Sequence, residues 1–136
     1  MKKPASEEKA CEVCAIDPTS HSFSKLCEVN NVVTFYTKPA DASKYNDADG
    51  VVRHFDLLLS QHSSKHWKWI VDAEGFSMRH AMETGVARGI LRLIEQKYGD
   101  NLDNIIVTNT NRAIQMAFRA IAPFFYKGFS EKVQFQ

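Results

Sequence analysis

The sequence predicts an α/β domain built on a small, mostly parallel sheet of about four strands joined by crossover helices. Short apolar runs of strand length occur at residues 32–37, 67–72, 105–109 and 132–135. Between them lie longer segments whose apolar residues recur every three or four positions, as in amphipathic helices. Alternation of strand and helix along the chain is typical of parallel strands with right-handed crossovers.

Length and composition indicate one domain with a single core. The chain has 136 residues, of which 44% are hydrophobic and 24% charged. Its formal charge of +1 provides no broad basic field, so we expect no nucleic-acid partner. No apolar run approaches the roughly eighteen residues of a membrane span, and no hydrophobic signal core follows the N-terminus. We therefore expect a cytoplasmic protein.

The N-terminal part predicts a flexible arm ahead of the domain. Residues 1–25 are charged and serine-containing with little periodicity, and residues 26–136 form the predicted α/β domain. After the strand at residues 32–37 comes a polar loop, in which Asp47 or Asp49 is the predicted N-cap of a helix of about three turns. The apolar face of this helix consists of Val51, Val52, Phe55, Leu58 and Leu59.

Three cysteines, Cys11, Cys14 and Cys27, lie in the first 27 residues. An odd number is not a disulfide framework, so we expect reduced thiols. Cys11 and Cys14 have the spacing of a zinc knuckle, and His21 and Cys27 would complete a set of four ligands. However, six residues separate Cys14 from His21 and no second close pair follows. The sequence therefore favours free thiols and no metal.

Two further helices are predicted between the remaining strands. The first spans residues 77–98 and ends at Gly99, a residue that accepts the left-handed conformation after a last turn. Its apolar positions are Met78, Met82, Val86, Ile90, Leu93 and Ile94. The second helix is ended or kinked by Pro123, which lacks an amide hydrogen. Its apolar positions are Ile114, Ala117, Phe118 and Ile121.

Several short motifs follow one another in a set order over about seventy residues, which makes chance agreement improbable. They are Asp72 with Gly75 beyond it, the helix closing at Tyr98, the Ile-Ile-Val-x-Asn strand, Ala117-Phe118 with Pro123-Phe124, and Ser130-x-Lys132-Val133-x-Phe135. Together they resemble the CRAL-TRIO lipid-binding domain of phosphatidylinositol-transfer-type proteins. In that family a helix and a strand normally follow the last of these motifs. The sequence stops at Gln136, so the resemblance implies a minimal or truncated domain that lacks one wall of its pocket.

An aromatic group surrounds Pro123 and either fills a core or lines a cavity, since each buried ring covers about 150–250 Å². It consists of Phe118, Phe124, Phe125, Tyr126 and Phe129. The resemblance implies that this region is a movable gate, which covers the acyl chains of a lipid and touches the membrane during exchange. The lipid-contacting residues that it implies are Ile114, Ala117, Phe118, Ile121 and Phe125.

The resemblance also implies a headgroup site. Family members that bind phosphatidylinositol use a glutamate after the tyrosine that ends the long helix, and a lysine and a threonine before the last strand. Asp100 stands at the glutamate position, Lys132 at the lysine position and Phe129 at the threonine position. A phosphate needs a cation and further donors, so Lys132 fits while Phe129 removes a donor. Lys132 as an exposed edge lysine is the alternative interpretation.

No catalytic motif is evident. Phosphate-binding loops, the Gly-x-Gly-x-x-Gly fingerprint and the Gly-x-Ser-x-Gly motif are all missing. Asp72 and Glu74 follow the end of a predicted strand, where α/β proteins place many sites, but carboxylates there commonly accept hydrogen bonds from loop amides. His62 and His66 are interpreted as solvated loop residues, because the helix ends at Ser63. We expect a protein that is not an enzyme and that needs no cofactor.

The sequence thus predicts binding, and transfer, of a phospholipid or other small hydrophobic ligand between the sheet and residues 112–129. The alternative is a degenerate form of the fold that binds another protein or forms a homodimer without lipid. Missing terminal elements would leave an exposed strand edge and an uncovered apolar face, both of which a partner covers readily.

Overall fold

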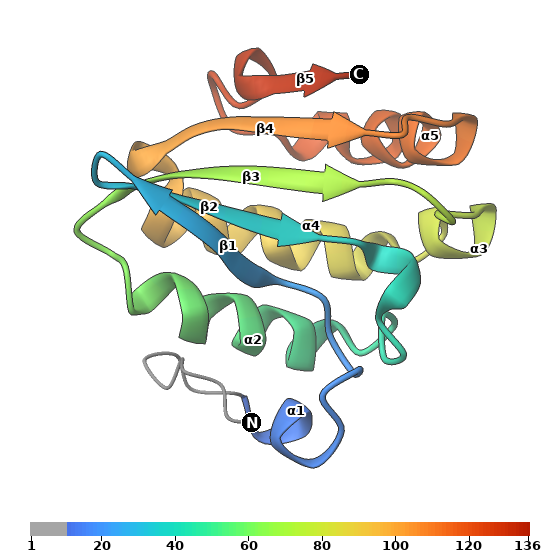
Figure 1. Cartoon of the computed structure of the whole chain (residues 1–136). Helices are drawn as coiled ribbons and strands as arrows, with labels where there is room; N and C mark the ends of the chain where they lie inside the picture. Colours follow the sequence, from blue (N-terminus) through green and yellow to red (C-terminus); the bar gives the residue numbers. More distant parts are fainter. Residues whose placement is uncertain (1–10) are drawn as a thin grey trace.

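Five strands form one sheet in a computed structural model that describes residues 11–136 (Figure 1). In sheet order they are β1 (Ser24–Val29), β2 (Val32–Thr37), β3 (His66–Asp72), β4 (Leu102–Thr108) and β5 (Val133–Phe135). β1 is antiparallel to β2, and the other neighbours are parallel. The predicted mostly parallel sheet is confirmed, with β1 as one strand more than the sequence predicts.

β1 and β2 form a hairpin around Asn30 and Asn31. Both asparagines have positive φ, at 54° and 68°, which asparagine tolerates better than most residues and which suits the twist of a tight hairpin. β1 was not predicted because nearly all its side chains face solvent, so its sequence lacks the alternation of apolar and polar residues that is typical of a half-buried strand. A bulge between Lys25 and Cys27 interrupts its pairing and protects this edge.

Helices connect the parallel strands, and α2 and α5 each begin at a side chain that caps them. The helices are α1 (Glu12–Ile16), α2 (Ala48–Ser60), α3 (Met78–Ala81), α4 (Thr84–Leu93) and α5 (Arg112–Ile121), with shorter helical turns at Pro39–Asp41, Ile94–Tyr98, Gly99–Asn101, Ala122–Phe124 and Ser130–Lys132. Asp47 caps α2, accepting a hydrogen bond from the Gly50 amide at 3.2 Å. Asn111 caps α5 through the Ile114 amide at 2.9 Å.

The predicted single helix over residues 77–98 is divided in two. α3 ends at Ala81, α4 starts after Glu83, and a π-helical turn then carries the chain to Tyr98. A reciprocal capping interaction between Ser77 and His80 stabilises the start of α3, and the non-helical backbone of Glu83 (ψ 63°) separates α3 from α4. Met82 is 76% exposed, so the buried apolar face begins only at Val86.

One face of the sheet is covered by α2, α4 and α5 (Figure 1). The buried positions of β2, β3 and β4 alternate along each strand, which places them on that face. They include Val33, Phe35, Trp67, Trp69, Val71, Ile105 and Val107. The hydrophobic core therefore lies between this face and the helices.

Residues 1–10 of the predicted arm lie outside the described residues. The remainder, residues 11–25, forms α1, a turn and the start of β1. It differs from the predicted flexible arm because five of its residues are buried in the domain, namely Cys11, Cys14, Ser20, His21 and Phe23. Phe23 stacks between Phe35 and Phe55, with ring centroids 4.7 and 3.9 Å apart. Over residues 11–136 the structure contains no helix long and apolar enough to cross a membrane.

Candidate functional site

An apolar cavity of about 110 Å³ lies between the sheet and the helices that cover it. Its floor is formed by Trp69 and Val71 of β3 and Ile105 of β4. The helices supply most of the remaining walls, through Val51, Phe55, Ala87, Ile90, Leu91, Ile94, Ile114, Ala117, Phe118 and Ile121. A site of this composition favours a hydrophobic ligand, with few groups to fix its orientation.

Four of the five predicted lipid-contacting residues line this cavity, namely Ile114, Ala117, Phe118 and Ile121. The fifth, Phe125, does not line it. Instead the Phe125 ring packs against Phe129, which does, with centroids 4.7 Å apart, and lies 6.5 Å from the Phe118 ring. Phe125 therefore supports the wall that α5 and the following turn provide.

The polar groups of the cavity gather beyond the carboxyl end of β2. Thr37 accepts a hydrogen bond from the Trp69 indole at 2.8 Å, and Ser22 accepts one from the Lys38 amide at 2.9 Å. Tyr45 lies in the loop that follows, and burial raises its pKa to about 12. The phenol is therefore neutral at physiological pH, and any polar recognition at this end depends on hydrogen bonds.

The predicted headgroup residues lie away from the apolar cavity. The Lys132 ammonium donates hydrogen bonds to the Gly99 carbonyl at 2.9 Å and the Leu102 carbonyl at 2.7 Å, which fastens the last turn to β4. Asp100 borders a separate, more polar pocket together with Lys97. The structure thus brings Lys132 beside the loop that contains Asp100, with its amine directed at backbone oxygens.

Asp72 links the carboxyl ends of three strands. Its carboxylate accepts hydrogen bonds from the Tyr36 hydroxyl at 2.6 Å, the Asn109 side-chain amide at 2.9 Å and the Glu74 backbone amide at 3.0 Å. Burial works against ionisation, but these hydrogen bonds together hold the pKa of Asp72 below its ordinary value. The hydrogen bond that the Tyr36 hydroxyl donates to Asp72 is also the main cause that raises the pKa of Tyr36 to about 12. This geometry is that of a structural carboxylate.

His62, His66 and Glu74, also considered from the sequence, do not form a common site. His66 lies 2.7 Å from Asp103, and the His62 ring packs edge-on against Phe35 with centroids 5.8 Å apart. Glu74 is exposed and pairs with Lys38 at 3.4 Å.

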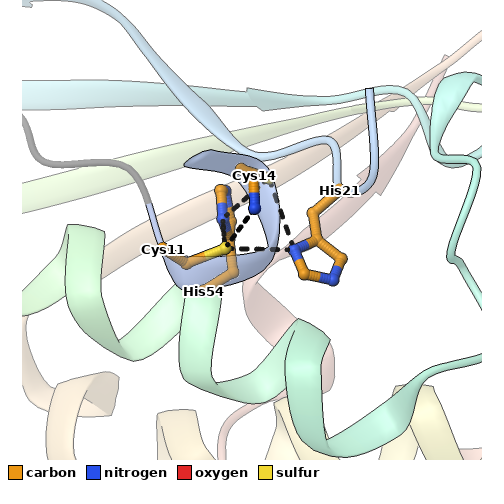
Figure 2. Close-up of side chains that lie close together, drawn as sticks. All are labelled: Cys11, Cys14, His21 and His54. Atoms are coloured by element: carbon orange, nitrogen blue, oxygen red, sulfur yellow. Dashed lines mark hydrogen bonds between the residues drawn. The ribbon is translucent and has the colours of Figure 1, made fainter. Parts of the chain in front are cut away.

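Four potential metal ligands converge between α1 and α2 (Figure 2). Cys11 and Cys14 come from α1 and its N-cap, His21 from the following loop, and His54 from α2. Their ligand atoms all lie within 4.8 Å of one another, and all four residues are buried. Burial raises the pKa of the Cys14 thiol and lowers that of His21. Cys27 is exposed on β1 and takes no part in this cluster.

The family model of the CRAL/TRIO domain matches residues 15–136. The chain belongs to the CRAL/TRIO family. Proteins of this family generally bind or transfer lipids and are generally not enzymes. The match covers the whole sheet and every residue that lines the cavity.

Among solved structures, the crystal structure of Sfh5 is similar to this CRAL/TRIO domain, with a TM-score of 0.67 at 14% sequence identity. The alignment covers 96% of this chain and 52% of Sfh5, so the chain spans about half the length of that protein. At this identity the likeness establishes the fold. A search of curated protein sequences finds no match.

His54 is the member of the cysteine–histidine cluster of this CRAL/TRIO domain that the sequence analysis did not single out. It lies three residues after Val51 and four before Leu58, on the buried stripe of α2. The sequence does contain one signal for it: a histidine at a position on the apolar face of a helix, in a chain that has a Cys-x2-Cys pair further upstream. Forty residues separate it from Cys14, so spacing alone does not connect the two.

Proposed function

We propose that this CRAL/TRIO domain binds one phospholipid, or another elongated hydrophobic molecule, between its sheet and α5, and exchanges it at membranes from the cytoplasm. The observation that carries the proposal is the apolar cavity lined by Ile114, Ala117, Phe118 and Ile121. Membership of a family that generally binds lipids supports it. Burial of acyl chains would supply the affinity, at about 0.8 kcal/mol per CH₂ group.

The size of the cavity requires a wall to move. Pockets that hold drug-sized ligands measure about 300–1,000 Å³, whereas this cavity measures about 110 Å³. The movable wall is the gate segment, residues 112–129. Left-handed backbone flanks it, at Asn109 (φ 51°) and Gly128 (φ 88°), and Pro123 interrupts it. These are the points at which the segment would turn outward to admit a lipid.

The outer side of the gate segment has the character of a membrane-contacting surface. Met116 is 41% exposed and Phe124 is 49% exposed, and Arg112, Arg119 and Lys127 are exposed on the same segment. Apolar side chains among basic ones favour the headgroup region of a bilayer. Replacing Met116 by Asp should slow lipid transfer between vesicles while leaving binding of a short-chain, monomeric phospholipid unchanged. Equal transfer rates for the wild type and the Met116→Asp variant would show that α5 is not part of the membrane-contacting surface.

Uptake of a fluorescent phosphatidylcholine tests the site. A Phe118→Asp variant places a carboxylate in the cavity wall, where its desolvation is unfavourable, so uptake should fall about tenfold or more. Gln115→Asp is the matched control, because Gln115 is exposed on the same helix and does not line the cavity. Circular dichroism and melting temperature establish that both variants fold.

Undiminished uptake by a folded Phe118→Asp variant would contradict the site. A wild-type chain that takes up no lipid and forms a stable dimer would instead favour the alternative function, in which the fold binds a protein partner or a second copy of itself. The exposed Leu26 and Val29 on the edge strand β1 would provide apolar surface for that contact.

A further inference from the structure

We propose that Cys11, Cys14, His21 and His54 bind a zinc ion that fastens the N-terminal segment to α2. Figure 2 shows the four side chains directed toward one point from three separate parts of the chain. Two thiolates and two imidazoles are a common ligand set for structural zinc. Binding of Zn²⁺ displaces the two thiol protons to solvent, so the dication and the two thiolates leave the buried site neutral.

The sulfur–nitrogen distances in the cluster are close to those of a tetrahedral zinc site. With Zn–S about 2.3 Å and Zn–N about 2.0–2.1 Å, sulfur and nitrogen ligands of a tetrahedron lie about 3.5–3.6 Å apart. The Nδ1 atom of His21 lies 3.5 Å from both sulfurs. The Nδ1 atom of His54 lies 3.3 Å from the Cys11 sulfur and 3.7 Å from the Cys14 sulfur. These four sulfur–nitrogen edges, of the six in a tetrahedron, therefore agree with coordination of one ion, and all four ligand atoms lie within 4.8 Å of one another.

The hydrogen bond at the far side of His54 selects the metal-binding tautomer. Its Nε2 atom lies 2.8 Å from the Phe23 carbonyl, which only accepts hydrogen bonds, so Nε2 holds the proton. In neutral imidazole the lone pair is then on Nδ1, the atom that faces the two sulfurs. Orientation of a ligating histidine by a backbone carbonyl is a usual feature of metal sites.

The sulfurs are also placed as zinc ligands. The Cys14 backbone amide donates a hydrogen bond to the Cys11 sulfur at 3.3 Å, an interaction that stabilises a thiolate. Cys11 and Cys14 are 8% and 7% exposed, and His21 and His54 are 7% and 6% exposed. Four protein ligands in a closed, buried position leave no place for a substrate, so the site is structural.

A disulfide between Cys11 and Cys14 is the competing chemistry. A disulfide gives no reason for two imidazole Nδ1 atoms to lie within 3.7 Å of both sulfurs. Zinc gives every one of these atoms a bond. The convergence of the two imidazoles on the two sulfurs thus favours the metal.

Metal content of the purified wild-type chain is the first test. After incubation with zinc under reducing conditions and removal of excess metal, we expect about one zinc ion per chain. Cobalt(II) in place of zinc should show intense visible bands of tetrahedral geometry and a near-ultraviolet sulfur-to-cobalt band. A strong chelator should release the metal and lower the melting temperature of the wild-type chain. These measurements need no variant, so they stand if the ligand variants fail to fold.

Variants then identify the ligands. Cys14→Ser and His54→Ala should each reduce zinc content well below one ion per chain and weaken the cobalt bands, with the sulfur band affected chiefly by Cys14→Ser. Cys27→Ser and His66→Gln are matched controls, because Cys27 and His66 are exposed and lie outside the cluster. Both should retain full metal content.

Zinc-free wild-type chain after this incubation would overturn the proposal, as would a cobalt spectrum without sulfur bands. Loss of zinc from the Cys27→Ser control would also overturn the assignment of ligands. A chain whose mass shows a Cys11–Cys14 disulfide and that binds no zinc after reduction would establish the disulfide instead.

Discussion

Asp72 is the polar residue that most directly ties the strands together, because it accepts hydrogen bonds from residues at the ends of β2, β3 and β4. Its pKa is lowered in the folded chain, so its stabilising contribution is complete above its ordinary value of 3.8 and is lost as the pH falls through the lower folded value. Asp72→Asn should therefore cost about 1 kcal/mol at neutral pH, a modest figure because the site is partly solvated.

Urea unfolding of the wild type and of Asp72→Asn, between about pH 7 and pH 3, measures this effect. The difference in unfolding free energy should narrow as the pH falls below the ordinary value of 3.8, because the wild-type carboxyl becomes protonated. Glu74→Gln is the control, since Glu74 is exposed. A difference that stays constant over this range would show that Asp72 does not act through its charge.

Residue types with a local mechanism are predictable from the sequence. Asp47 as the cap of α2 needs only its neighbours in the chain, and the structure confirms it. The set formed by Cys14, His21 and His54 is different, because the fold brings its members together across forty residues. From the sequence, Cys27 was considered as a fourth ligand beside His21, although the spacing favoured free thiols, and its exposed position on β1 keeps it outside the cluster.

At the scale of the elements, α4 packs against α2 through the small residue Gly89. A Cβ atom at Gly89 would lie 2.9 Å from a methyl carbon of Val52, whereas one at Gly85 would meet nothing within 4 Å. Gly85→Ala should therefore raise the unfolding free energy by up to about 1 kcal/mol, through the higher helix propensity of alanine. Gly89→Ala should gain less or destabilise, because the two helices must separate.

Thermal unfolding of both variants tests this packing, and each is the other's control. A Gly89→Ala variant at least as stable as Gly85→Ala would show that α2 and α4 have room between them.

The last turn of the chain depends on Lys132. Lys132→Met removes hydrogen bonds to two backbone carbonyls, Gly99 and Leu102, which should cost about 1–3 kcal/mol in unfolding free energy. Lys127→Met is the matched control, because Lys127 is exposed. Chemical denaturation measures both. An unchanged stability for Lys132→Met, together with weaker binding of an anionic phospholipid, would favour the headgroup role that the sequence predicts for Lys132.

Strands and helices follow from the sequence where one face is buried. Buried residues alternate along β2, β3 and β4, apolar residues recur with the helical period in α5, and the predicted positions of these elements are confirmed. β1 lacks a buried face, which explains why it has no signal. The helical period over residues 77–98 continues through Met82, but the backbone leaves the helical conformation at Glu83, where ψ is 63°. Apolar periodicity does not report such a break.

At the scale of the whole molecule, a layer of helices within residues 11–136 covers one face of the sheet (Figure 1). The apolar cavity lies between this layer and the sheet. That the gate segment lies over the sheet could be predicted from its resemblance to the family, and four of its predicted residues line the cavity. The size of the cavity could not be predicted from the sequence, because it depends on how rings such as Phe118 and Phe129 pack against the floor of the cavity. His21 joins the two sites, since it lines the cavity and belongs to the cysteine–histidine cluster.

Native mass spectrometry of the chain purified from a eukaryotic host tests the central claim, lipid binding, most directly. The chain should appear with a non-covalent adduct of the mass of one phospholipid, which denaturation releases and fragmentation identifies. Incubation with liposomes should fill any empty fraction. A chain that stays free of lipid after this incubation, whether monomer or dimer, would contradict the proposed function.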